Sequence, residues 1–262
     1  MVSRVMTVAS TDSGGGAGIM ADLKTFTAMK VFGTAVIVSL TAQNSVTVKS
    51  IYEVPVYFIN DQFDAIMEDI GTDAAKTGML YSERIISAVT EKFLQYDVHN
   101  IVVDPVMVSK TNARLLKEDA VFTMVHKLMK IATLITPNIP ESEVISSMKI
   151  NNVEDARIAA KKISGITGSA VLVKGGHSSG NLSTDILYDG KEYSEFSDIR
   201  IDTRNTHGTG DTLSASIASY LAAGKNLYDS ISLARKYIEG AIKNSFPMGN
   251  GYGSLSHFWA IK

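Results

Sequence analysis

The sequence predicts an α/β fold in which helices cover both faces of a central, mostly parallel sheet. Short runs of β-branched and other apolar residues alternate along the chain with amphipathic stretches of helical spacing. Some of these runs, such as Ile101–Val103 and Val171–Val173, are apolar at every position, which is typical of strands buried on both faces. Together these observations favour three layers, in the order helix, sheet, helix.

Composition restricts the classes of protein that fit this fold. The chain has 262 residues, 45% of them hydrophobic, so it can bury a full core, and we expect one domain over residues 1–262. The 25 basic and 27 acidic residues give a net charge of -2, which does not favour nucleic acid or an anionic membrane as a partner. The absence of cysteine excludes disulfides and thiolate metal sites. With no leader-like N-terminus and no apolar run of about 18 residues, we expect a soluble cytoplasmic protein.

The first elements follow the alternating pattern. We expect a strand at Val5–Ala9, a helix through Ala21–Met29, a strand at Ala35–Leu40 and a helix around Phe58–Ile70. The segment Val46–Val54 is predicted to depart from the parallel order.

Later elements repeat the pattern with recognisable helix starts. Ser82 can cap one helix, and Asn151, with a glutamate three residues later, resembles a capping box that opens another. Leu134–Ile135 is a further short strand. The segment Ile186–Phe196 is predicted to be a hairpin, because Asp189-Gly190 lies between its halves.

Polar or glycine-rich residues follow five of the predicted strands. These groups are Asp12–Gly18, Thr41–Asn44, Asp104–Pro105, Pro137–Glu141 and Lys174–His177. Ligands of open α/β sheets bind beyond the carboxyl ends of the strands, so a single crevice could receive all five groups.

The segment Asn205–Thr212 joins a glycine turn to the start of a predicted helix. Leu213, Ile217 and Leu221 follow at intervals of four residues and form the apolar face of that helix. Gly208 and Gly210 let backbone N–H donors approach an anion closely. Asp211, in the same turn, could accept the proton of a hydroxyl group that attacks a phosphate. The segment therefore indicates phosphoryl transfer to an alcohol. The alternative is that Asp211 only caps its helix.

Four glycines, at positions 14, 15, 16 and 18, precede the first predicted helix. They do not fit the P-loop pattern, because Lys24 lies too far into the helix, and they fit a dinucleotide fingerprint only if it is stretched. Close approach of the backbone to a small flat or hydroxylated ligand fits better, and a tight turn is the alternative. Asp22 lies within that helix, where an exposed, solvated carboxylate is the ordinary interpretation.

Two further side chains could contact a ring. Gln43 offers donors and an acceptor, as the edge of a heterocycle requires, and the alternative is hydrogen bonding to the local backbone. Met79 follows Lys76 and Gly78 and could form an apolar wall, although core packing is the usual role of methionine.

Asp104 follows a strongly apolar strand, where a buried carboxylate needs a partner, and a cation is a suitable one. Asn138 and Glu141 add oxygen ligands for a hard cation at the next strand end, and the alternative for Glu141 is interaction with a helix N-terminus beside Pro140. Lys174 could meet a nucleotide phosphate. His177 and His207 lack a ligand-type partner four residues away, so neither is predicted to bind metal.

Taken together, these segments resemble the bifunctional hydroxymethylpyrimidine and phosphomethylpyrimidine kinases of thiamine biosynthesis, which belong to the ribokinase superfamily. The matching segments occur in family order and span residues 10 to about 255. They are Ser13–Ile19, Asp22–Thr25, Leu40–Asn44, Lys76–Leu80, Asp104–Met107, Thr136–Glu141, Val173–His177 and Thr206–Ser214.

The resemblance implies a ribokinase-like fold and an ATP-dependent kinase. Such an enzyme phosphorylates the hydroxymethyl group of 4-amino-5-hydroxymethyl-2-methylpyrimidine and then adds a second phosphate to give the diphosphate. It implies ATP and Mg²⁺ as cofactors and a homodimer as the usual assembly. It leaves open whether a monovalent cation assists.

The resemblance also implies roles for individual residues. Asp211 would act as the base, and the backbone of Gly208, Thr209 and Gly210 would form the anion hole. The pyrimidine would be bound by Gln43, Asp22, Ala17, Gly18, Met79 and Val106. ATP would be bound by Lys174, Thr209, Gly210, Asn138 and Glu141, with residues after Leu227 beside adenine. Asp104 and Glu141 would organise Mg²⁺, partly through water.

One residue departs from the family pattern. The bifunctional pyrimidine kinases commonly carry cysteine where this chain has Asp211, whereas sugar kinases and pyridoxal kinases of the superfamily carry aspartate. A carboxylate beside a helix N-terminus stays ionised and suits the first phosphorylation, but its charge could hinder the second. A pyridoxal or pyridoxine kinase is therefore the alternative within enzymes. A ligand-binding regulator without turnover and a dinucleotide-dependent oxidoreductase are alternatives from other classes.

Overall fold

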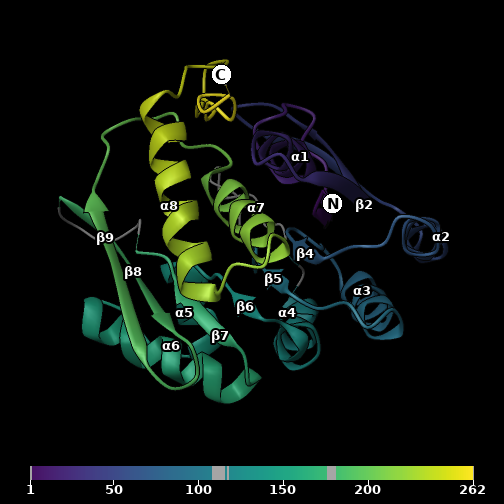
Figure 1. Cartoon of the computed structure of the whole chain (residues 1–262), viewed down its shortest axis with the longest axis horizontal. Coiled ribbons are helices and arrows are strands. Elements are labelled where there is room, and N and C mark those ends of the chain that lie inside the picture. The colour runs from purple at the N-terminus through teal and green to yellow at the C-terminus, as the bar shows by residue number, and fades with distance from the viewer. Residues whose placement is uncertain (1, 108–115, 117, 176–180, 262) are drawn as a thin grey trace.

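Nine strands form a single sheet between two layers of helices in the computed structural model, which describes residues 2–107, 116, 118–175 and 181–261 (Figure 1). The strands are β1 (Arg4–Ser10), β2 (Phe32–Gln43), β3 (Val48–Glu53), β4 (Ala74–Thr77), β5 (Ile101–Val103), β6 (Leu134–Ile135), β7 (Ala170–Val173), β8 (Leu182–Tyr188) and β9 (Tyr193–Ile199). The helices are α1 (Gly18–Ala28), α2 (Val56–Met67), α3 (Glu83–Gln95), α4 (Glu118–His126), α5 (Ile139–Ser146), α6 (Val153–Thr167), α7 (Thr209–Ala222) and α8 (Leu227–Lys243), with a 3₁₀ turn at Leu128–Ile131. The predicted three-layer α/β fold is confirmed.

The sheet has the order β3-β2-β1-β4-β5-β6-β7-β8-β9. Six adjacent strands, β2-β1-β4-β5-β6-β7, run parallel to one another. Strand β3 at one edge and strands β8 and β9 at the other are antiparallel to their neighbours. Both predicted departures from the parallel order are therefore confirmed, including the hairpin of β8 and β9 around Asp189-Gly190. Because the carboxyl ends of the parallel strands share one edge, the segments that follow them gather there.

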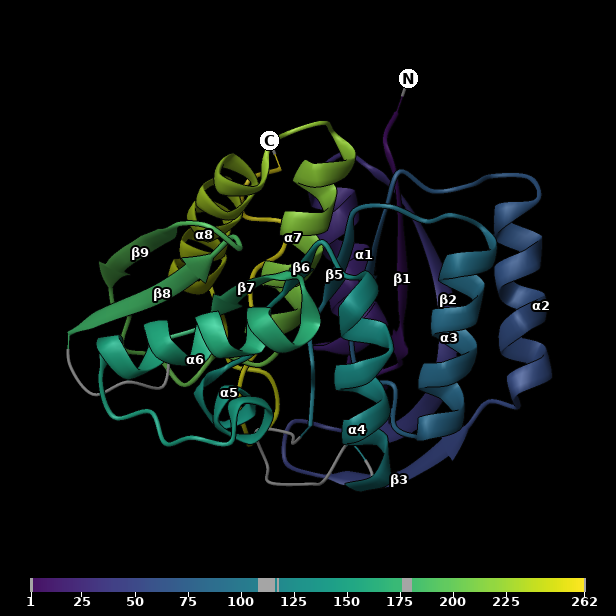
Figure 2. The same cartoon turned by 90° about the horizontal axis from the view of Figure 1, so that it is seen from below.

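The central strands are buried on both faces. Val103 belongs to a core beneath α2 to α6, whereas its neighbour Val102 belongs to a second core beneath α1, α7 and α8. Figure 2 shows α2, α3, α4 and α6 on one side of the sheet, with α7 and α8 on the other. The continuous apolar runs in the sequence thus have the cause expected of them, which is a helical layer on each face.

Two predicted helix starts differ in detail. Ser82 is the N-cap residue of α3, but its hydroxyl group donates to Glu53 Oε2 at 2.9 Å and makes no capping bond. Helix α6 begins one residue later than predicted, because Asn152, not Asn151, accepts the bond from the Asp155 backbone N–H. Asn151 instead donates its backbone N–H to the Asp155 carboxylate.

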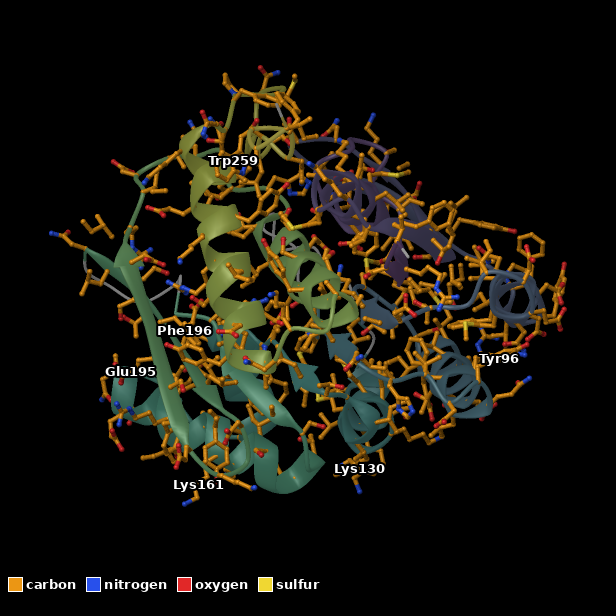
Figure 3. All side chains as sticks on the ribbon, viewed as in Figure 1. Tyr96, Lys130, Lys161, Glu195, Phe196 and Trp259 are labelled. Atoms are coloured by element: carbon orange, nitrogen blue, oxygen red, sulfur yellow. The ribbon has the colours of Figure 1, made fainter. Side chains whose placement is uncertain are left out.

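The C-terminal part of the chain packs along α8. Phe196 of β9 lies in the core against α8, with its ring centroid 5.1 Å from that of Tyr228 (Figure 3). Trp259 packs over Gly240 near the other end of the helix and donates its indole N–H to the Tyr237 carbonyl at 3.1 Å. Of the helices described, none is both long and apolar enough to cross a membrane.

Candidate active site

Asp211 lies in the first turn of α7, directly above the carboxyl ends of the central strands. The helix begins after Gly208, whose φ of 80° is in the left-handed region that glycine adopts without strain. Asp211 makes no capping bond; its Oδ1 accepts a hydrogen bond from Lys76 Nζ at 2.9 Å, and the Gly18 backbone N–H also bonds to the carboxylate. The alternative that Asp211 only caps its helix is therefore wrong.

The Asp211 carboxylate is held in its charged form. Its side chain is 16% exposed, and burial by itself would raise its pKa, but the nearby Lys76 ammonium outweighs burial and lowers the pKa. An ionised carboxylate with partial exposure, at the start of a helix, has the properties of a base that a hydroxyl group can reach.

Lys76 is completely buried beneath this carboxylate, at the end of β4. Its ammonium also contacts both oxygens of Asp22 at 2.9 Å, and the Thr7 hydroxyl donates to Asp22 Oδ2 at 2.6 Å. Burial raises the pKa of Asp22 to about 7 in spite of the lysine. The expectation that Asp22 is exposed and solvated is wrong, because its side chain is fully buried under the site and engaged by protein groups.

A second charged group lies beside the first. Lys174 Nζ contacts Asp104 Oδ1 at 2.7 Å, and the Thr136 hydroxyl donates to the same oxygen at 3.2 Å. Glu141 is buried nearby, and burial raises its pKa to about 7, against the effect of Lys174. Asp104 thus has the cationic partner that its burial requires, and in this structure the cation is a lysine.

Asn138 and Glu141 form a capping box at the start of α5. The Glu141 backbone N–H donates to Asn138 Oδ1 at 2.9 Å, and the Asn138 backbone N–H donates to Glu141 Oε2 at 2.8 Å. The alternative interpretation of Glu141, interaction with a helix N-terminus, is therefore confirmed as a contact in the structure. Pro140 is the second residue of this helix.

Gly210 joins the two charged groups. A Cβ atom added at Gly210 would lie 3.3 Å from Asp104 Oδ2 and 3.4 Å from Lys174 Nζ. The first turn of α7 therefore lies directly against the Asp104–Lys174 pair, one residue before Asp211. An anion at this turn would meet backbone N–H donors and Lys174 together.

The glycine run at 14 to 18 is held by Asp12, for which the sequence indicated no individual role. The Asp12 carboxylate accepts hydrogen bonds from the backbone N–H groups of Gly14, Gly16 and Ala17 at 2.8, 3.1 and 2.9 Å. His207 Nε2 lies 2.8 Å from Asp12 Oδ2. His207 therefore connects the glycine run to the turn before α7, and His177 lies outside the described residues.

The remaining predicted ligand-binding residues lie along the same edge of the sheet. Gln43 ends β2 and exchanges backbone hydrogen bonds with the Ser13 hydroxyl group at 2.7 and 2.8 Å. Met79 follows β4 and is buried, and Val106 follows β5 and is half-buried. Their joint contact with a ring stays a prediction.

A hollow of about 580 Å³ borders the glycine run. It is bordered by Gly14 to Gly16, by α1 and by residues 246–261, and neither Asp211 nor Asp104 lines it. The glycine run therefore contacts Asp211 through Gly18 and borders the hollow through its earlier glycines. We assign the candidate active site to the charged side chains around Asp211 and Asp104 and not to this hollow, because those side chains include a candidate base and a cation that an anion could meet.

The described residues include no cluster of three or more histidine and carboxylate side chains that could hold a metal ion without other ligands. Asp104 and Glu141 provide two carboxylates next to Lys174. That donor set fits Mg²⁺, which commonly binds through one or two carboxylates and completes its coordination with phosphate oxygens and water.

Comparison with known proteins points to one family. A family model described as phosphomethylpyrimidine kinase matches residues 12–256. The thiamine biosynthesis bifunctional protein ThiED of Geobacter sulfurreducens is 45% identical over 98% of this chain, which spans only 53% of that relative's length. The hydroxymethylpyrimidine/phosphomethylpyrimidine kinase of Bacillus subtilis is 37% identical, with 98% of this chain and 95% of the relative covered. An ADP complex of Bacillus subtilis pyridoxal kinase has a TM-score of 0.92 at 35% identity, with 98% of each chain covered.

Proposed function

The chain belongs to the phosphomethylpyrimidine kinase family, and we propose that it phosphorylates the hydroxymethyl group of 4-amino-5-hydroxymethyl-2-methylpyrimidine with ATP, in thiamine biosynthesis. We propose further that the resulting monophosphate accepts a second phosphoryl group. One observation carries this proposal. The ionised Asp211 lies in a helix N-terminal turn beside Gly208–Gly210 and a lysine–carboxylate pair, as transfer of a phosphoryl group to an alcohol requires.

In the first step, Asp211 takes the proton of the substrate hydroxyl group as its oxygen attacks the γ-phosphorus of ATP. The new O–P bond forms while the bond between the γ-phosphorus and the ADP oxygen breaks. We propose that the backbone of Gly208, Thr209 and Gly210 forms the anion hole at the helix start, where the helix dipole favours the negative charge of the group in transfer. In the structure the Thr209 N–H donates to the Thr206 carbonyl oxygen at 3.3 Å, so the N–H groups of Gly208 and Gly210 would be the first to meet the anion. Catalysis by such a site is mainly positioning and charge stabilisation.

Lys174 and the residues at the start of α5 bind the nucleotide in this proposal. Lys174 contacts the phosphates as a point charge, and Asn138 and Glu141 line the same side. When bound, Mg²⁺ would be held by Asp104 and Glu141 and would neutralise charge on the phosphate oxygens. Any dependence on a monovalent cation is to be tested by exchanging K⁺ for Na⁺ in the assay.

The pyrimidine lies against Gln43, Ala17, Gly18, Met79 and Val106 in this proposal. The support is that Gln43 ends β2 and the other residues follow β1, β4 and β5, at the edge of the sheet where Asp211 lies. The Gln43 amide would pair with the aminopyrimidine edge, which presents both a donor and an acceptor. Asp22 would affect the pyrimidine site from beneath it, by binding Lys76, because its carboxylate is enclosed by Lys76 and Thr7.

The test is the mass of the product after prolonged incubation with hydroxymethylpyrimidine, Mg²⁺ and ATP. Addition of one phosphoryl group supports the first step, and addition of two supports both. No turnover of the pyrimidine alcohol would overturn the proposal. A product that stops at one phosphate would restrict it to the first step, as the charge of Asp211 near a phosphorylated substrate could cause.

Pyridoxal kinase is the second candidate function. It is favoured by Asp211 and by the likeness to the Bacillus subtilis pyridoxal kinase structure. Initial rates on hydroxymethylpyrimidine and on pyridoxal, measured side by side at equal substrate concentrations, distinguish the two. The main proposal expects the pyrimidine to react faster.

We also propose that residues 1–262 act as one domain, that the chain forms a homodimer, and that it works in the cytoplasm. The single sheet across the chain supports one domain. The cross-strand pair Leu40 and Tyr52, 44% and 66% exposed on β2 and β3, offers apolar surface for a partner copy. The absence of cysteine is compatible with a reducing compartment. Light scattering on the purified chain would test the dimer.

A further inference from the structure

Lys76 has an unusual position for a lysine, because its whole side chain is enclosed. Its exposed fraction is 0%, and its ammonium lies 2.9 Å from Asp22 Oδ1, Asp22 Oδ2 and Asp211 Oδ1. An ammonium group has three N–H donors, so these three contacts can use all of them. Buried lysines are rare unless paired, and this one is shared between two carboxylates.

The two carboxylates that share the lysine differ in access. Asp22 is 0% exposed and also accepts from the Thr7 hydroxyl group, so it can serve only as an internal partner. Asp211 is 16% exposed and is the member of the trio that a ligand can reach. The lysine is thus anchored from below by Asp22 and acts upward on Asp211.

The backbone around Lys76 leaves the ammonium little freedom. A Cβ atom at Gly78 would lie 2.9 Å from Lys76 Nζ and 3.1 Å from Ala9 Cβ. The space that a side chain at position 78 would fill is therefore taken up by the lysine head group. Glycine at 78, like the buried strand β4, fits a lysine whose position is fixed.

We propose that Lys76 is the positioning residue for the base: it orients the Asp211 carboxylate and keeps it charged, while Asp22 holds Lys76 in place. This inference rests on the proposed function of Asp211. In this arrangement Lys76 contacts neither substrate nor ATP, because the Asp211 carboxylate lies between the Lys76 ammonium and the exposed side of the site.

The charges around Asp211 predict the direction of each perturbation. Lys76 faces it from β4, Asp22 lies beyond Lys76 on α1, and His207 precedes it in the chain. Asp104 and Lys174 lie under the same helix turn, and His257 contacts Thr212 of that turn and interacts with Asp211. Removing Lys76 would leave two carboxylates in one buried space, which favours protonation of one of them. Neutralising Asp22 would instead leave the lysine to Asp211 alone and favour the charged form there.

The absence of cysteine from the chain makes a direct measurement possible. In an Asp211→Cys variant the new thiol is the only one, and the pH dependence of its alkylation rate gives its pKa without any substrate. We expect this pKa to lie below the ordinary value of about 8.5. Adding Lys76→Met should raise it by at least about one pH unit, whereas adding Asp22→Asn should lower it further.

The matched control is Lys92→Met in the same Asp211→Cys background. Lys92 is a mostly buried lysine paired with Asp64 at 2.6 Å, on α3, and its loss should leave the thiol pKa unchanged. A general loss of packing would move the thiol pKa in the same direction for both added site substitutions. Opposite shifts for Lys76→Met and Asp22→Asn are specific to the proposed charge arrangement. If the Lys76→Met variant does not fold, the Asp22→Asn shift decides alone.

In the chain with Asp211 intact, Lys76→Met should lower kcat at least about tenfold with little change in the KM for ATP. The acid limb of its kcat profile should also move to higher pH. Lys76→Arg should restore part of the rate. A thiol pKa that is the same with and without Lys76 would overturn the inference. Because that measurement needs no pyrimidine, a failure of the proposed substrate would not be mistaken for a failure of the charge arrangement.

Discussion

The close approach of the turn before α7 to the glycine run gives a quantitative prediction for Gly208→Ala. Gly208 has a φ of 80°, and an added Cβ atom would overlap the Gly16 carbonyl oxygen and lie 3.4 Å from Ala17 Cα. A non-glycine residue in the left-handed region costs roughly 1–2 kcal/mol. Forcing extra atoms into a packed space adds about 1–3 kcal/mol. The free energy of unfolding should therefore fall by about 2–5 kcal/mol.

Two other glycines separate these contributions. Gly224, after the end of α7, has a φ of 78° but no atom within 4 Å of an added Cβ, so Gly224→Ala should show only the backbone cost of roughly 1–2 kcal/mol. Gly165, inside α6, also has open space and no positive φ, so Gly165→Ala should stabilise the chain by up to about 1 kcal/mol.

Urea unfolding of the three variants, followed by far-ultraviolet circular dichroism, is the assay. At roughly 2–4 °C per kcal/mol for a chain of this size, Gly208→Ala should also lower the melting temperature by about 4–20 °C. We expect a loss of kcat as well, because the anion hole must move away from the glycine run to make room. If Gly208→Ala is no less stable than Gly224→Ala, the close approach of the two segments is not as described.

Three further predictions concern single residues. Asp211→Asn keeps the shape of the side chain but removes the base, so kcat should fall roughly 10²–10⁴-fold with a smaller effect on ATP binding, whereas Asp155→Asn in the first turn of α6 should leave kcat unchanged. Gln43→Leu should weaken the preference for the pyrimidine over pyridoxal, and an unchanged ratio of initial rates would count against its role. Burial lowers the pKa of His257 to about 4 from its ordinary 6.5, so between these values the unfolded chain binds the additional proton, and stability is lost as the pH falls. Through this residue the free energy of unfolding should decrease by roughly 3 kcal/mol between pH 7 and pH 4, and urea titrations of His257→Gln should lack that part of the decrease.

The sequence predicted those parts of the site that depend on residues close together in the chain. The helix that starts at Thr209 is indicated by Gly208 and by the apolar spacing after it, and the strand ends were visible as apolar runs followed by polar residues. The α6 start shows the limit of such signals. Asn151 and Asn152 each precede an acidic residue by three positions, so the sequence contains two equal caps, and the backbone uses the second.

The partners of the charged residues were not predictable in this way. Lys76 is 54 positions from Asp22 and 135 from Asp211, so no window of sequence contains the trio. A weaker signal was available for Asp22 alone. It lies three residues after Ile19 and four before Phe26, all on the buried stripe of α1, which is a poor position for a solvated carboxylate.

The state of Asp211 depends on its neighbours more than on its being a carboxylate. Burial and the proximity of Asp22 both favour the protonated form, and a base in that form cannot accept a proton from an alcohol. Lys76 reverses the balance, and it can do so because it is enclosed: a solvated ammonium at the same distance would be screened by water. The same enclosure makes the lysine depend on Asp22, since a buried ammonium with one partner would be less well compensated. The helix turn that presents Asp211 and the strand that presents Lys76 must therefore stay in contact for the site to work. Glycine at 78 permits that contact, because an added Cβ atom there would lie 2.9 Å from Lys76 Nζ and 3.6 Å from Asp211 Oδ1.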